Sequence, residues 1–208
     1  INQTGQTTRA GETLEELKNN SERTWDFTNT PLMDLGVLKA DATNWTNVDT
    51  NSDDIGDNTQ FKSKSAFTTL QANGVTLYMT EGLTFSGVTA TEGDLRIDIN
   101  RQLLINKQGI SITLPSLEKG QEITVNFSST GSNSRNIIPG GDVSSTAAVV
   151  SNSTDTVKCT VTMTADGRPT FTVGTGTGGS AVYIYSISVT RAESDGFGLY
   201  SNSDRLQV

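Results

Sequence analysis

Oxygen-bearing side chains alternate along one stretch of the sequence, at Asp49, Asn51, Asp53 and Asp57. Carboxylate and amide oxygens at alternate positions are the ligands that calcium takes from a loop. The helix–loop–helix calcium motif also needs Gly at the sixth position and Glu at the twelfth, where this chain has Asp54 and Gln60. The spacing excludes that motif. It leaves two alternatives, a looser structural calcium site or a solvated acidic loop.

An aromatic ring with polar neighbours precedes this loop, in Asn44-Trp45-Thr46. Aromatic rings stack on the apolar face of a sugar ring, while neighbouring amides bind its hydroxyls. Trp45 is therefore a candidate sugar platform and Asn44 a candidate hydrogen-bonding partner. The other interpretation is that Trp45 fills the core where a short helix meets a sheet, since Trp is usually well buried.

Charged side chains lie on one side of the predicted strand Leu95-Arg-Ile-Asp-Ile99 and in the turn after it, at Arg96, Asp98 and Arg101. Alternation predicts that Leu95, Ile97 and Ile99 face the core, which leaves these charges outward. Arginine can hold a carboxylated sugar with two parallel hydrogen bonds. Outward charges on a strand more commonly form solvated cross-strand pairs, and both interpretations remain open.

Several catalytic classes are excluded by residue type. The chain has no histidine and one cysteine, which removes histidine triads, histidine zinc sites and disulfides within the chain. The cysteine, Cys159, alternates with Val157 and Val161 and is expected in the core. The glycines of Gly174-Thr-Gly176-Thr-Gly-Gly179 match the dinucleotide-binding spacing, but they lie between two predicted strands, which favours a hairpin loop. Paired carboxylates can always be drawn among 23 acidic residues, so none is singled out as catalytic.

The overall charge restricts the partners. A formal net charge of -8 argues against nucleic acid and anionic membranes. It would also repel an anionic polysaccharide unless a basic patch or bridging calcium intervened. No apolar run approaches the roughly 18 residues that a membrane-spanning helix needs. No export signal is visible, and any such signal is expected to have been removed.

The elements that must position these residues are mostly short strands. One short helix is predicted from Pro31 to about Ala40, capped by Thr30, with Leu32, Leu35 and Leu38 on one face. Strands then recur every 8–15 residues by inspection, separated by Gly, Asn, Asp and Pro. They are expected at 25–27, 75–79, 95–99, 103–105, 110–114, 123–127, 147–150, 157–163, 171–173 and 181–190. In the last of these, Tyr183, Tyr185, Ile187 and Val189 are expected to share a face.

This pattern predicts an all-β fold: a single antiparallel β-sandwich or jelly roll of about eight to ten strands, with one short helix. The sandwich is assigned to residues 24–191. Residues 1–23 are expected to be a flexible or loosely docked leader, and residues 192–208 a tail, edge strand or linker.

A series of short motifs resembles a known family. The sequence is similar to the β-sandwich accessory domain found beside pectate-lyase-like domains in secreted proteins of gut Bacteroidetes. The motifs are Thr24-Trp-Asp-Phe-Thr28, Leu38-Lys-Ala-Asp41, Asn44-Trp-Thr46, Ala72-Asn-Gly-Val75, Glu81-Gly-Leu-Thr-Phe85, Arg96-Ile-Asp98, Leu117-Glu-Lys-Gly120 and Tyr183-Ile-Tyr-Ser-Ile-Ser-Val189. The resemblance implies an exported, carbohydrate-associated domain of galactose-binding-like or jelly-roll type. It supplies no catalytic residues, and this chain lacks the lyase domain.

The sequence therefore predicts a non-catalytic, carbohydrate-binding-like module outside the cell or on its surface, with no cofactor beyond a structural calcium ion. The alternative is a structural or adhesive module that binds protein through its tails or sheet edges. A polysaccharide-active enzyme is a more distant third. An exposed aromatic concave face would favour the first, and flat polar faces the second.

Overall fold

The computed structural model describes residues 22–48, 60–98 and 102–191. It confirms the predicted fold class, because antiparallel sheets dominate and one α-helix precedes most of the strands. The predicted leader and tail lie outside the described residues except for Glu22 and Arg23, and Arg23 begins the first strand. No helix in the described part of the chain is long and apolar enough to cross a membrane.

Two antiparallel sheets make up the sandwich. The larger runs in the order β13-β10-β15-β8-β7-β3-β2, with β1 also paired to β15. Its strands are β1 (Arg23–Asp26), β2 (Trp45–Asn47), β3 (Gln60–Ser63), β7 (Leu95–Asp98), β8 (Leu103–Ile105), β10 (Glu122–Ser129), β13 (Val157–Thr162) and β15 (Val182–Val189). The smaller runs β12-β11-β14-β9-β6, from β6 (Thr84–Ser86), β9 (Ser111–Thr113), β11 (Arg135–Gly140), β12 (Val149–Ser151) and β14 (Thr170–Val173).

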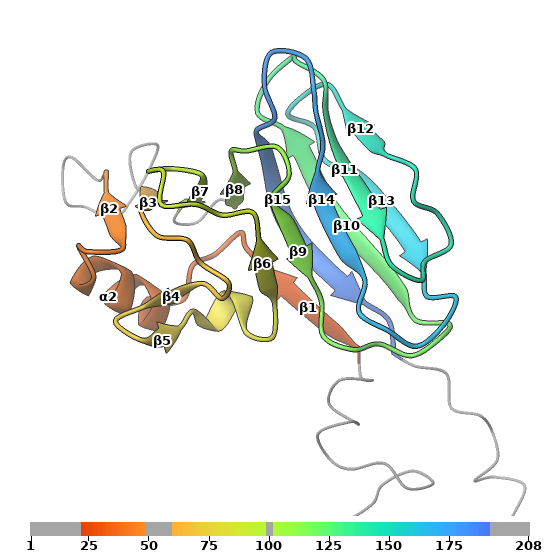
Figure 1. Cartoon of the computed structure of the whole chain (residues 1–208), viewed down its shortest axis with the longest axis horizontal. Helices are drawn as coiled ribbons and strands as arrows, with labels where there is room; N and C mark the ends of the chain where they lie inside the picture. Colours follow the sequence, from red (N-terminus) through yellow and green to blue (C-terminus); the bar gives the residue numbers. More distant parts are fainter. Residues whose placement is uncertain (1–21, 49–59, 99–101, 192–208) are drawn as a thin grey trace, which may run out of the picture.

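The apolar core lies between the two sheets, which explains the alternation in the sequence. Ile123, Val125 and Phe127 of β10 are fully buried, as are Phe171 and Val173 of β14. Figure 1 shows the smaller sheet in front of β15, β10 and β13, while the β7-β3-β2 end of the larger sheet extends beyond it toward the helix.

Helix α2 (Leu32–Ala40) covers that end together with a hairpin and a short 3-10 helix (Figure 1). The hairpin consists of β4 (Gln71–Ala72) and β5 (Val75–Thr76), and η1 (Tyr78–Thr80) follows it. The predicted helix cap is wrong: Pro31 occupies the N-cap position. Among the described residues, no side chain caps the helix, and the hydroxyl of buried Thr30 has no hydrogen-bond partner. The predicted leucine face is also wrong in part, since Leu32 is 85% exposed while Asp34 and Leu38 are buried.

Two further differences have local causes. A β-bulge shifts the pairing between Asn126 and Phe127, so Ile184 and Ile187 point into the core, whereas Tyr183 and Tyr185 are half-buried outside it. The strand β11 was not anticipated because it contains Pro139, a strand breaker. Here β12 pairs only with residues 135–137, so the missing N–H of Pro139 lies beyond that ladder.

Candidate functional site

Trp45, the predicted sugar platform, lies in the core. Its side chain is 1% exposed, and its ring stacks on Phe67 with centroids 5.0 Å apart. Its indole Nε1 donates a hydrogen bond to the backbone oxygen of Gln71 at 2.9 Å. A ring packed in this way has no face available to a sugar, so the core interpretation of Trp45 is the correct one.

Asn44, the predicted partner of Trp45, uses its amide inside the protein. Its Nδ2 donates to Asp41 Oδ2 at 2.7 Å, and its Oδ1 accepts from Ser65 Oγ at 2.5 Å. Both contacts fix the connection between α2 and β2. Asn44 therefore supports the structure behind the hairpin, and a ligand contact by it stays a prediction.

The two described charged residues of β7 differ in exposure: Asp98 is buried and Arg96 is half-buried. Asp98 is 1% exposed, and its Oδ2 accepts a hydrogen bond from Gln60 Nε2 at 3.1 Å. Burial raises the pKa of the Asp98 carboxyl to about 6. Arg96 is half-buried and lies opposite Lys62 in the sheet register, so its directly opposite neighbour on β3 carries the same charge. A ligand contact by Arg96 stays a prediction.

The predicted calcium ligands Asp49, Asn51, Asp53 and Asp57, and Arg101, lie outside the described residues. Within the described ranges, no three acidic or cysteine side chains gather in a way that could hold a metal ion. Calcium binding therefore stays a prediction from the sequence.

Exposed apolar side chains gather at α2, the hairpin and η1 instead. Of the six large hydrophobic side chains exposed on the described surface, four belong to this region: Leu32, Met33, Val75 and Tyr78. Tyr78 is 59% exposed, and it is the one aromatic residue among the six. We call the surface formed by Met33, Val75 and Tyr78 the Tyr78 rim. Such clusters mark binding surfaces more often than scattered apolar residues do.

The hairpin turn places Val75 on this rim. Asn73 and Gly74 have φ of 49° and 75°, which fits the two-residue turn that joins closely paired strands. The Asp41 carboxylate secures the turn, because its Oδ2 accepts the Asn73 N–H at 2.9 Å in addition to the Asn44 amide. Burial alone would raise the pKa of Asp41, but the hydrogen bonds from Asn44 and Asn73 outweigh it and hold the pKa below its usual value.

A second buried carboxylate positions Tyr78. Asp34 is 2% exposed, and its Oδ1 and Oδ2 accept the backbone N–H groups of Tyr78 at 2.6 Å and of Met79 at 2.9 Å. It thereby ties the first turn of η1 to α2. Burial raises the pKa of Asp34 more than these two hydrogen bonds lower it. Since both oxygens are engaged by backbone, Asp34 is an anchor and not a free acid.

Two hollows adjoin Tyr78. The larger, of about 570 Å³, has apolar walls that include Met33, Val37 and Leu83, interspersed with the threonines Thr69, Thr76 and Thr84. The smaller, of about 340 Å³, is lined mainly by Arg23, Thr24, Trp25, Asp26 and Asn29. Tyr78 and Glu81 line both hollows.

The chain between the hollows is fixed from β1. The backbone oxygen of Glu81 accepts hydrogen bonds from Arg23 Nη2 at 2.6 Å and from Trp25 Nε1 at 2.8 Å. The Arg23 guanidinium lies over the Trp25 ring, 4.4 Å from its centroid. Gly82, with φ of 85°, allows this approach, because an added Cβ would lie 3.3 Å from Arg23 Nη1. The wall between the hollows is thus rigidly supported.

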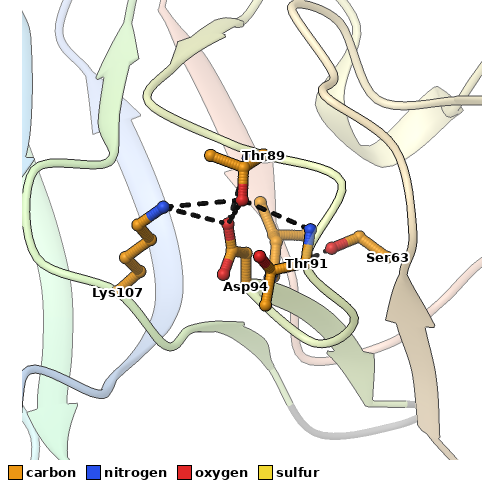
Figure 2. A network of polar contacts seen from close by, with 6 residues as sticks. Ser63, Thr89, Thr91, Asp94 and Lys107 are labelled. Atoms are coloured by element: carbon orange, nitrogen blue, oxygen red, sulfur yellow. Dashed lines mark hydrogen bonds and ion pairs between the residues drawn. The ribbon is translucent and has the colours of Figure 1, made fainter.

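A separate polar cluster near β7 contains a carboxylate, an amine and hydroxyl groups, which are residue types found in catalytic sites (Figure 2). Asp94 Oδ2 accepts hydrogen bonds from Thr89 N at 3.0 Å and Thr89 Oγ1 at 2.6 Å, and lies 3.5 Å from Lys107 Nζ. Ser63 Oγ accepts the Leu95 N–H at 3.1 Å beside it. These side chains accept backbone N–H groups at both ends of the 89–94 loop, from Thr89 and from Leu95. The cluster therefore holds the loop closed and needs no catalytic role to explain it.

The glycine-rich segment lies between two strands, β14 and β15, as predicted, but the predicted hairpin loop is wrong, because these strands belong to different sheets and the segment crosses from one sheet to the other. It wraps the buried guanidinium of Arg135, which donates to the backbone oxygens of Ser134, Thr177 and Gly178. No helix begins there, so the dinucleotide-binding arrangement is absent from the segment.

Comparisons with known proteins give distant structural similarity. No protein-family model and no curated protein sequence matches the chain. Among solved structures, part of the chain is similar to the CBM36-1 domain of a multidomain xylanase from the hindgut metagenome of Trinervitermes trinervoides, with 9% identity, a TM-score of 0.33, and coverage of 44% of this chain and 78% of that one.

Two other carbohydrate-binding modules give comparable values. A module CBM36 in complex with calcium and xylotriose matches with 12% identity and a TM-score of 0.34, covering 51% of this chain and 87% of that one. A structure of CBM51-2 in complex with GlcNAc, with INT domains, from Clostridium perfringens ZmpB matches with 13% identity and a TM-score of 0.35, covering 51% and 25%. Similarity at this level carries no argument about a ligand, so the function rests on the site itself.

Proposed function

We propose that the protein is a non-catalytic, carbohydrate-binding-like module, spanning about residues 24–191, of a secreted or cell-surface protein, and that it holds a glycan against Tyr78. The observation that supports this most is the exposed Tyr78 ring between two hollows. Apolar rings with an exposed face are costly in water unless they have a partner, and sugar rings offer one.

The larger hollow suits such a ligand in size and chemistry. Its volume falls within the roughly 300–1,000 Å³ typical of small-molecule sites. Its threonine hydroxyls can donate and accept hydrogen bonds, as sugar hydroxyls require, while the apolar wall contacts the C–H groups of a sugar. The site would bind by stacking and hydrogen bonding, without covalent chemistry.

The way in which the carboxylates are used supports a non-catalytic role. Asp34 and Glu81 both line the larger hollow, an arrangement that in principle suits acid–base hydrolysis. Both oxygens of Asp34 are held by backbone N–H groups, so it cannot deliver a proton without releasing η1. Glu81 alone does not complete the pair of carboxylates.

A protein partner is the second candidate. Leu32 is 85% exposed on α2 and does not line either hollow, which extends the apolar surface beyond what one glycan site needs. The Tyr78 rim would then contact protein, as the structural or adhesive hypothesis requires. One set of variants separates the two candidates.

The test is binding of purified protein to immobilised neutral and pectic polysaccharides and to a soluble glycan array, with Tyr78→Ala and Tyr78→Phe. We expect Tyr78→Ala to reduce glycan affinity at least tenfold with unchanged unfolding, and Tyr78→Phe to retain most of it. Val150→Ala truncates an apolar side chain of 53% exposure on the smaller sheet and is the matched control.

Three results would contradict the proposal. They are the binding of no glycan, binding that Tyr78→Ala leaves unchanged, and release of reducing ends from a bound polysaccharide. The same binding assay with a chelator tests the calcium prediction. If the chelator abolishes glycan binding and Tyr78→Ala leaves it unchanged, the 49–57 loop is the site instead.

A further inference from the structure

The two hollows share two lining residues. Tyr78 and Glu81 line both, and Glu81 is held between them by the hydrogen bonds from Arg23 and Trp25. A ligand that occupies the larger hollow and extends past the Tyr78 ring therefore enters the smaller one. This geometry suits a chain of sugars better than a single ring.

The smaller hollow has different chemistry. Asn29 is an exposed amide, and the Asp26 carboxylate accepts hydrogen bonds from Thr28 N at 2.9 Å and Thr28 Oγ1 at 2.6 Å, both at Oδ1. Arg23 lies beside them, held in place by Glu81 and Trp25. Donors and acceptors in one hollow match the hydroxyl pairs of a sugar. The larger hollow supplies apolar contact, and the smaller supplies hydrogen bonding.

The charges around the two hollows argue against an acidic sugar. Arg23 is the one cation among the residues that line them, against the carboxylates of Asp26, Asp34 and Glu81. The whole chain carries a net charge of -8. A uronic acid carboxylate would be repelled by this surface, whereas an uncharged sugar would not.

We propose that the two hollows are consecutive subsites for a neutral oligosaccharide of at least two sugar units, which passes over Tyr78. This inference rests on the proposed function and adds to it the polarity and the length of the ligand. It assigns Tyr78 to contact with both sugars and Asn29 to the second.

The experiment titrates the protein with matched series of one to six units: neutral cello-, xylo-, manno- and galacto-oligosaccharides, and oligogalacturonides. We expect affinity for one neutral series to rise at least tenfold between one unit and two or three, with oligogalacturonides bound at least tenfold more weakly. Asn29→Ala should remove this gain with length. Asn152→Ala, which changes another exposed asparagine that follows β12 and lines neither hollow, is the control.

The outcomes distinguish failure of the two-subsite inference from failure of the proposed function. Binding that depends on Tyr78 but does not increase with length, or that Asn29→Ala leaves intact, would overturn the two-subsite inference and keep the proposed function. Tighter binding of oligogalacturonides than of any neutral series would overturn the choice of a neutral ligand. Failure of every oligosaccharide to bind would overturn the proposed function itself.

Discussion

At both the Tyr78 rim and the glycine-rich loop between β14 and β15, a buried charged side chain binds irregular backbone. The charge is negative at the rim and positive at the loop. At the rim, the buried carboxylates of Asp34 and Asp41 accept backbone N–H groups from η1 and the hairpin turn. At the loop, the buried guanidinium of Arg135 donates to backbone carbonyls. In each region, the charged side chain binds backbone N–H or C=O groups that no helix or strand pairing satisfies.

The difference lies in what each region exposes. Within the loop, the exposed residues are threonine or glycine, whereas the rim leaves Val75 and Tyr78 more than half exposed. A buried charge thus marks a place where irregular backbone is held, and it does not by itself mark a functional centre. The functional candidate is identified by exposed apolar surface next to hollows.

The largest expected effect concerns Asp98, a buried carboxyl whose pKa is raised because its hydrogen bonding does not offset its burial. It should make the free energy of unfolding depend on pH. Its pKa of about 6 exceeds the 3.8 of an unperturbed Asp, so the folded state prefers the protonated form. Its contribution to stability is therefore fully present below pH 3.8 and lost as pH rises through 6, a loss of about 3 kcal/mol at most. Urea unfolding between pH 4 and 7 should show it, and Asp98→Asn should flatten that dependence.

Asp41 should behave in the opposite sense. Its lowered pKa means that its contribution is present above pH 3.8 and lost as pH falls through the folded value. Carboxyl carbon NMR titration should therefore find Asp41 below 3.8 and Asp98 above it. Two carboxyls shifted in the same direction would contradict the argument from their hydrogen bonds.

The next test compares the two anchors directly. Asp41→Ala and Arg135→Ala each leave backbone groups without a partner, and each should destabilise the fold by about 2 kcal/mol in urea unfolding. Only Asp41→Ala should also weaken glycan binding, because the hairpin that carries Val75 depends on it. Asp155→Ala, at an exposed position, is the control for loss of a carboxylate. Equal loss of binding in both anchor variants would mean that global stability controls the site.

The sequence predicted the sandwich because burial in strands leaves a local, period-two pattern. The site was predicted less well, because its support is not local. Trp45 was left open between a sugar platform and a core residue, with Asn44 as its candidate partner. In the structure, Trp45 holds the hairpin through Gln71, and Asn44 binds the Asp41 carboxylate that holds Asn73. The contacts of Trp45 with Gln71 and of Asp41 with Asn73 join residues 26 and 32 positions apart, and no periodicity encodes them. Residues 75–79 were predicted as one strand, which concealed Tyr78. Asn73-Gly74 indicates a hairpin turn, but nothing local shows that β5 ends at Thr76.

The hairpin turn allows a smaller test of the same comparison. Gly74 has φ of 75°, and an added Cβ would meet nothing within 4 Å, so Gly74→Ala costs backbone strain alone, about 1 kcal/mol. Gly131, in the turn between β10 and β11, also has open space but no positive φ. Gly131→Ala should change the unfolding midpoint by less than half as much. Equal changes in the unfolding midpoint for Gly74→Ala and Gly131→Ala would contradict the role of the strained turn in positioning Val75.

Tyr78→Phe should have the smallest effect, and it distinguishes the two ways in which a rim tyrosine can act. The ring is more than half exposed, and within the described residues its backbone, not its hydroxyl, makes the hydrogen bonds that hold η1. Removing the hydroxyl should therefore change the free energy of unfolding by less than about 0.5 kcal/mol. If the ring acts by stacking, calorimetric affinity for the preferred oligosaccharide should fall by less than about threefold, because the π-face is retained. A loss as large as that of Tyr78→Ala would instead assign recognition to the phenolic hydroxyl, and the rim would then resemble the polar loop in its chemistry.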